Sequence, residues 1–70
     1  MLARGRAPDA VALRTLETEI EPRSVDGHAG LGLALVRAGR ISEARAAFRR
    51  ALELDRYDTR AMEWLRRPGG

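Results

Sequence analysis

The chain lacks several features that would assign it to common classes of protein. It has no cysteine, which excludes disulfides and thiolate metal sites. No apolar run approaches the ~20 residues that a membrane-spanning helix needs, and the first residues lack the apolar core of a secretory signal. Lysine is also absent, so arginine alone supplies the basic residues behind a formal net charge of +3. Residues 1–70 are long enough for one domain, which we expect to be cytoplasmic.

Residues 25–58 carry the clearest pattern, two amphipathic helices joined at a glycine. Ser24 is a good N-cap for the first helix, because its hydroxyl can accept a hydrogen bond from an otherwise unpaired backbone N–H. Gly39 fits the end of that helix, where a left-handed residue is favoured, and Ser42 is the expected cap of the second. Apolar residues recur at helical spacing on both segments, and they are Ala29, Leu31, Leu33, Ala34, Leu35 and Val36, followed by Ala44, Ala47, Phe48, Ala51, Leu52 and Leu54.

Two glycines inside the first of these helices indicate a close contact. Gly30 and Gly32 each cost the helix up to ~1 kcal/mol relative to alanine. A sequence that keeps them needs room for a neighbouring helix at that point. We therefore predict that Gly32 and Ala44 are the small residues at which the two helices touch.

The same stretch resembles one repeat of the tetratricopeptide repeat family. The residues that carry the resemblance, at the family's spacing, are His28, Leu31-Gly32, Leu35 and Ala44-x-x-x-Phe48. The chain departs from the family pattern with His28 for Trp, Leu35 for Tyr and Arg56 for Pro. The resemblance implies an all-α fold of antiparallel helical hairpins, as in a fragment of an α-solenoid, with a full repeat at residues 25–58 and partial repeats on both sides.

Residues 1–24 resemble the second half of an earlier repeat. A shift by the family length of about 34 residues places Pro22 opposite Arg56, and Arg14 opposite Phe48. We expect one helix here that ends at Pro22, with the apolar side formed by Ala10, Leu13, Leu16 and Ile20. That side lacks a preceding partner helix.

Residues 59–70 begin a third unit, which brings the expected total to about four helices. Asp58 or Thr59 is placed to cap this helix, and Pro68 is placed to end it. The apolar residues that a following helix would cover are Ala61, Met62, Trp64 and Leu65. Large exposed apolar patches are uncommon on monomers. We therefore predict self-association through Met62, Trp64 and Leu65, as a two-fold dimer anchored by Trp64. In this dimer the two ends of one chain, the other being the side with Leu13, Leu16 and Ile20, cover those of its partner.

No residue set in the sequence supports catalysis, a metal or a cofactor. His28 is the only histidine, and the nearby carboxylate of Asp26 lies on a different face of the helix. The position of His28 matches the large packing residue of the repeat, which predicts a structural role. The carboxylates of Glu17, Glu19 and Glu21 spread around their helix and do not converge. The sequence therefore predicts a protein that is not an enzyme.

The arginines of the second helix raise nucleic-acid binding as an alternative function. The strip consists of Arg45, Arg49, Arg50 and Arg56, and its ordinary interpretation is a solvated face paired locally with Glu53. Base reading would require side chains such as Asn or Gln, and single-strand binding would require interleaved aromatic residues. Both are missing from this segment, so nucleic-acid binding is not the favoured function.

The resemblance implies that the first helix of each hairpin lines a groove that receives a partner. The residues that it assigns to that groove are Asp26, Ala29, Leu33, Val36, Arg37, Arg60 and Glu63. Because Ala29 and Leu33 stand where carboxylate-gripping members have polar residues, an apolar or helical partner segment fits better. Alternatively, Leu33 and Val36 pack against the adjacent helix.

We conclude from the sequence that the chain is a protein-interaction or scaffold module for a protein or peptide partner, or for itself. Two alternatives stay open. One is arginine-mediated nucleic-acid binding, and the other is a docking fragment of a larger enzyme whose chemistry lies elsewhere.

Overall fold

The computed structural model describes residues 6–66, with side chains from Ala10 onward, and this part is all-α. Its four helices are α1 (Arg6–Ile20), α2 (Val25–Arg37), α3 (Ile41–Leu54) and α4 (Thr59–Arg66). The predicted all-α fold of about four helices is confirmed. The helix stop predicted at Pro68 lies outside the described residues.

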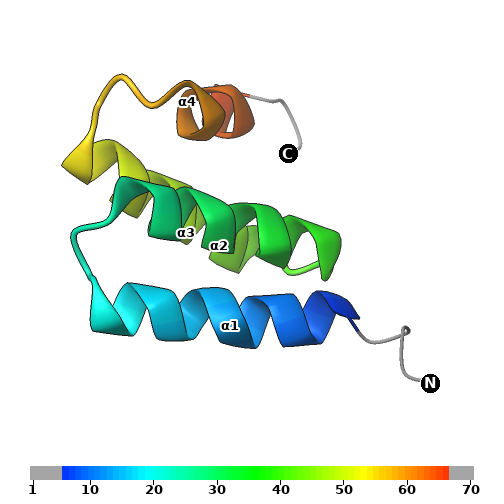
Figure 1. Cartoon of the computed structure of the whole chain (residues 1–70). Coiled ribbons are helices and arrows are strands. Elements are labelled where there is room, and N and C mark those ends of the chain that lie inside the picture. The colour runs from blue at the N-terminus through cyan, green and yellow to red at the C-terminus, as the bar shows by residue number, and fades with distance from the viewer. Residues whose placement is uncertain (1–5, 67–70) are drawn as a thin grey trace.

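The helices follow one another as antiparallel neighbours joined by short turns (Figure 1). α2 and α3 form the central pair, while α1 packs against α2 and α4 packs mainly against α3. Figure 1 shows α1 and α4 on opposite sides of that pair. One side of α1 and one side of α4 therefore have no neighbouring helix within the described part of the chain.

The two ends of α2 have the capping contacts that the sequence predicts. Ser24 Oγ accepts a hydrogen bond of 3.0 Å from the backbone N–H of Gly27. Gly39 has a φ of 80°, and its N–H donates to the carbonyl of Val36 at 3.0 Å. The N–H of Arg40 donates to the carbonyl of Leu35 at 2.8 Å. These last two bonds form a Schellman motif, in which a glycine at positive φ avoids the Cβ clash of other residues.

α3 begins earlier than the sequence predicts, so the assignment of Ser42 as its cap is wrong. The helix starts at Ile41, and its N-cap is Arg40, whose side chain makes no capping bond. The reason is the tight turn at Gly39, which leaves no spare residue before α3. Arg40 instead forms an ion pair of 2.7 Å with Glu43 in the first turn.

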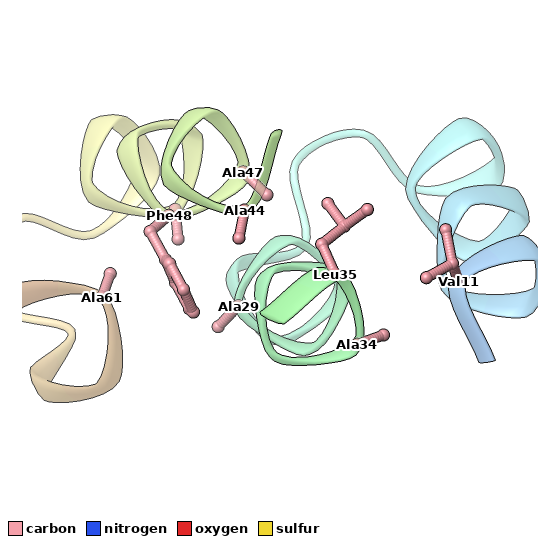
Figure 2. Close-up of a cluster of buried hydrophobic side chains, with 9 residues drawn as sticks. Val11, Ala29, Ala34, Leu35, Ala44, Ala47, Phe48 and Ala61 are labelled. Atoms are coloured by element: carbon pink, nitrogen blue, oxygen red, sulfur yellow. The ribbon is translucent and has the colours of Figure 1, made fainter. Parts of the chain in front are cut away.

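The core consists mostly of alanine around a single large ring. Its buried hydrophobic members are Val11, Ala29, Ala34, Leu35, Ala44, Ala47, Phe48, Ala51 and Ala61. Phe48 is completely buried and points from α3 into the space between Ala29 of α2 and Ala61 of α4 (Figure 2). Small residues on all three helices let this one ring fill the centre, which confirms the predicted core positions of Phe48 and Ala44.

α1 contacts the rest of the molecule through the side opposite to its large apolar residues. Val11 and Thr18 are buried, and the hydroxyl of Thr18 donates to the carbonyl of Thr15 at 2.7 Å. The apolar side predicted for this helix is solvent-exposed, with 56% of Leu13, 51% of Leu16 and 70% of Ile20 accessible. α1 therefore packs on α2 through smaller side chains such as Val11 and Thr18, and its larger apolar side chains are exposed to solvent.

Candidate functional site

The apolar residues predicted to line a groove turn partly inward. Ala29 is completely buried, so its assignment to a partner-binding surface is wrong: its side chain faces Phe48 and α4. Leu33 and Val36 are half-buried and pack against the core. The alternative of packing against neighbouring helices therefore holds for part of both side chains, and the remainder is accessible.

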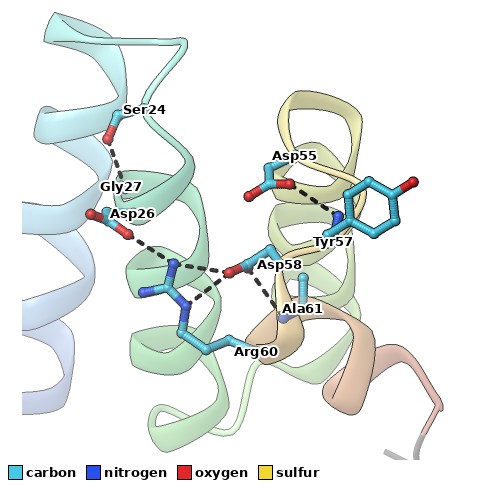
Figure 3. A network of polar contacts seen from close by, with 8 residues as sticks. All are labelled: Ser24, Asp26, Gly27, Asp55, Tyr57, Asp58, Arg60 and Ala61. Carbon is cyan, nitrogen blue, oxygen red and sulfur yellow. Dashed lines mark hydrogen bonds and ion pairs between the residues drawn. The ribbon is translucent and has the colours of Figure 1, made fainter.

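The charged residues predicted for the same surface are exposed, and two of them are joined (Figure 3). Arg37 lies near the end of α2 and Glu63 lies in α4. Nη2 of Arg60 donates to Oδ1 of Asp26 at 2.8 Å, which links the first turns of α2 and α4. Asp26 and Arg60 are 34 residues apart, which is the repeat length of the family that the sequence resembles.

Asp58 accepts two hydrogen bonds from the same guanidinium and also caps α4. Its Oδ1 accepts from Nε of Arg60 at 3.1 Å and from Nη2 at 3.0 Å. Its Oδ2 accepts from the backbone N–H of Ala61 at 3.3 Å. Of the two caps that the sequence allowed, the structure uses Asp58. A single buried carboxylate thus starts α4 and positions Arg60.

The two ion pairs of Arg60 differ in their exposure to solvent: the pair with Asp58 is partly buried, and the pair with Asp26 is exposed. The hydrogen bonds with Asp26 and then with Asp58 raise the pKa of the Arg60 guanidinium above its ordinary value. The Asp58 side chain is 8% exposed, whereas the side chains of Asp26 and Arg60 are 88% and 43% exposed. Water weakens an exposed ion pair, so a partner can displace Asp26 more readily than Asp58.

Asp58→Ala is expected to destabilise the fold by about 0.5–2 kcal/mol, the usual cost of losing a helix cap. Asp26→Ala removes only an exposed ion pair and should cost less than ~1 kcal/mol. Urea unfolding followed by circular dichroism measures both. Equal losses for the two variants would contradict the distinction between the capping and the exposed aspartate.

A shallow hollow beside Asp26 contains residues that the sequence pattern did not identify. It has a volume of about 340 Å³ and lies where α1 ends and α2 begins, lined by Arg14, Glu17, Ile20, Glu21, Ser24, Asp26 and Gly27. Arg14 pairs with Glu17 at 3.0 Å and reaches α2 at Gly30, whose missing Cβ would lie 3.4 Å from Nε of Arg14. Gly30 is the one feature of the sequence that could have indicated this hollow, because a glycine at that position leaves room for the Arg14 side chain.

His28 has the structural role that the sequence predicts. Its Nε2 lies 2.8 Å from the carbonyl oxygen of Pro22. Since a carbonyl only accepts, this nitrogen carries the proton and donates. The bond fixes the turn between α1 and α2. Residues 6–66 contain no group of three or more side chains that could hold a metal ion.

The residues predicted for self-association lie partly against the molecule's own core. Met62, Trp64 and Leu65 are half-buried. The ring of Trp64 stacks on Phe48, with centroids 6.0 Å apart and an interplanar angle of 4°. Much of the Trp64 ring is therefore used within the chain. A dimer anchored by it stays a prediction.

The arginines of α3 are unevenly paired. Arg50 forms an ion pair of 2.7 Å with Glu53, which confirms the predicted local pairing. Arg45, Arg49 and Arg56 form no ion pair with any other residue that the structure describes. Their charge is thus available on the outer side and at the end of α3.

Comparison with known proteins identifies the central hairpin. A family model described as tetratricopeptide repeat matches residues 25–58, the segment that contains α2 and α3. No curated protein and no solved structure matches the chain. Among the described helices, none has the length and apolar character required to cross a membrane.

Proposed function

Residues 25–58 are a tetratricopeptide repeat, and from this we propose that the chain binds a segment of a partner protein on the surface formed by α2 and α4. Repeats of this family generally mediate protein–protein interaction. The proposal assigns no reaction and no cofactor to the chain, and it places the protein in the cytoplasm.

One observation carries the proposal, the mixed character of the surface across α2 and α4. Leu33 and Val36 supply partly accessible apolar area, and the exposed charges of Arg37, Arg60 and Glu63 lie on the same two helices. An apolar centre with a polar rim is the usual anatomy of a protein–protein contact. The Asp26–Arg60 ion pair supports this surface by fixing α2 against α4.

The chemistry of the surface favours an apolar or helical segment as the ligand. Of the two arginines on this surface, Arg60 is already held by Asp58 and Asp26. Arg37 alone is left to pair with an acidic group, whereas a carboxylate clamp needs several convergent donors. Leu33 offers an apolar contact that an amphipathic helix can use, as in helix-in-groove recognition.

A charge exchange on this surface should weaken partner binding while leaving the fold intact. Peptides that bind the immobilised chain are first selected from a displayed library of helical and extended peptides. The affinity of each selected peptide is then measured by titration against the wild type and the variants. The double variant Arg37→Glu/Glu63→Arg keeps the net charge and alters only exposed residues. We expect it to weaken binding by at least about tenfold, which corresponds to ~1.4 kcal/mol.

The matched control is Arg40→Glu/Glu43→Arg, which makes the same exchange at an exposed ion pair of 2.7 Å where α3 begins. It should leave peptide affinity unchanged. Equal losses in both double variants, or no loss in either, would refute the α2–α4 surface as the binding site.

Nucleic-acid binding by the α3 arginines is the second candidate, favoured only by the unpaired Arg45, Arg49 and Arg56. It predicts an affinity for duplex DNA whose logarithm falls linearly with the logarithm of the salt concentration. A titration with a short duplex at several salt concentrations distinguishes the two functions. The possibility of a docking fragment of a larger enzyme depends on chain context and remains a proposal.

A further inference from the structure

The outer side of α1 carries an apolar ridge. Leu13, Leu16 and Ile20 are all more than half exposed. Their spacing of three and four residues places them on one side of the helix, and the buried Val11 and Thr18 lie on the opposite side. Because α2 is the only described helix in contact with α1, the ridge lies on a side of α1 that no described helix covers.

Carboxylates flank this ridge. At 100° per residue, Glu17 lies on one side of Ile20, and Glu19 lies on the other side of Leu16. Glu17 is paired with Arg14, whereas Glu19 and Glu21 form no ion pair with another described residue. Two copies that met ridge to ridge would bring these like charges together, which disfavours a two-fold contact through α1.

A surface of the opposite charge lies where α3 ends. A hollow of about 600 Å³ is lined there by Arg49, Leu52, Glu53, Leu54 and Arg56. Glu53 is engaged by Arg50, which leaves the charges of Arg49 and Arg56. The next residue along the chain, Tyr57, is 78% exposed, and aromatic side chains are enriched at interaction hot spots. This α3-end face, defined by Arg49, Leu52, Leu54, Arg56 and Tyr57, is apolar and keeps a net positive charge, because its two arginines outnumber Asp55, whose Oδ1 accepts from the backbone N–H of Tyr57 at 3.0 Å.

The two faces cannot meet within one chain, because α1 contacts α2 and not α3, and the ridge lies on the side of α1 opposite to the residues that are buried against α2. We propose that they meet between copies, with the ridge of Leu13, Leu16 and Ile20 from one copy seated on the α3-end face of the next. The contact joins apolar side chains and pairs Glu19 and Glu21 with Arg49 and Arg56. It is head-to-tail, so it leaves one free ridge and one free α3-end face on every pair.

This arrangement differs from the two-fold dimer predicted from the sequence, which was anchored by Trp64. It also uses neither Arg37 nor Glu63, so it goes beyond the proposed partner-binding function and can fail independently of it.

Sedimentation equilibrium of the 70-residue chain tests the contact. Because each face is small, association is expected only toward about 1 mM protein, the weak end of specific binding. It should extend beyond dimers as concentration rises. It should also weaken from about 0.01 to 0.15 M salt, because the screening length falls from ~30 to ~8 Å.

Two variants separate a head-to-tail contact from a two-fold one. Leu16→Ser/Ile20→Ser alters only the exposed ridge, and Arg49→Glu/Arg56→Glu alters only exposed arginines of the α3-end face. Circular dichroism verifies that both fold as the wild type does. Each variant alone should self-associate at least about tenfold more weakly than the wild type. An equimolar mixture retains one intact ridge and one intact α3-end face, so it should form a dimer that grows no further.

The control is Arg40→Glu, a charge reversal at an exposed residue outside both faces, which should leave association unchanged. A wild-type chain that stays monomeric at about 1 mM in low salt would overturn the proposal. So would association that strengthens with salt, or a mixture that stays monomeric although the wild type associates.

Discussion

Replacing Phe48 with alanine is expected to lower the free energy of unfolding by about 3–5 kcal/mol, the usual cost of deleting a buried aromatic ring. Phe48 is the single large side chain that is completely buried among the described residues. Its ring also stacks on Trp64. Around it the core is mainly alanine, which cannot extend to fill the space. The variant therefore loses contacts among α2, α3 and α4 together.

A loss of this size approaches the whole stability of the chain. A domain of 70 residues is expected to hold only ~3.5–10 kcal/mol in total, so Phe48→Ala should be largely unfolded near physiological temperature. Thermal melting followed by circular dichroism measures this. Tyr57→Ala is the matched control, because Tyr57 is highly exposed. A Phe48→Ala melt that coincides with the wild-type melt would show that the ring contributes little to the core.

Gly32→Ala is expected to destabilise the fold by about 1–3 kcal/mol through overpacking. A Cβ at position 32 would lie 2.6 Å from Cε1 of Phe48 and 2.7 Å from its Cζ. The ring is enclosed by the core and cannot retreat without moving α3. Gly32→Leu should be more damaging still, because a larger side chain would push α2 and α3 apart.

Gly30 provides the control for this prediction, because it lies in the same helix. A Cβ there would lie 3.4–3.5 Å from the flexible end of the Arg14 side chain, an ordinary contact distance. Gly30→Ala should therefore stabilise α2 by up to ~1 kcal/mol through helix propensity alone. Chemical denaturation of both variants measures the two changes, and changes of the same sign and size would refute the close contact at Gly32.

The central hairpin could be predicted from the sequence because its signals are local. Ser24 caps the first turn of α2 across three residues, and Gly39 occupies a position that needs a positive φ. The core position of Phe48 could be predicted because Ala44 precedes it by four residues and Ala51 follows it by three, which places all three on one face of α3. Each of these features depends on residues within one or two helical turns, so the order of side chains along the sequence is sufficient to predict it.

The candidate surface was harder to predict, because exposure depends on what packs against each helix. Ala29 and Leu33 lie one helical turn apart on α2, yet Ala29 is enclosed by Phe48 and α4, while Leu33 remains partly accessible. The hollow beside Asp26 arises only when Arg14 of α1 lies across Gly30 of α2. Neither contact produces a repeating pattern of apolar residues that could be recognised in the sequence.

The sequence by itself determined the four helices, the repeat at residues 25–58 and the capping residues Ser24 and Gly39, because backbone geometry and apolar spacing act locally. Only the tertiary structure decided which side of each flanking helix is used. On α1 it turned Val11 inward and left Leu16 outward, since the face that fits against α2 is the one with small side chains and not the most apolar one. At α4 it placed the ring of Trp64 on that of Phe48, a contact between two helices that the spacing of side chains within one helix does not reveal.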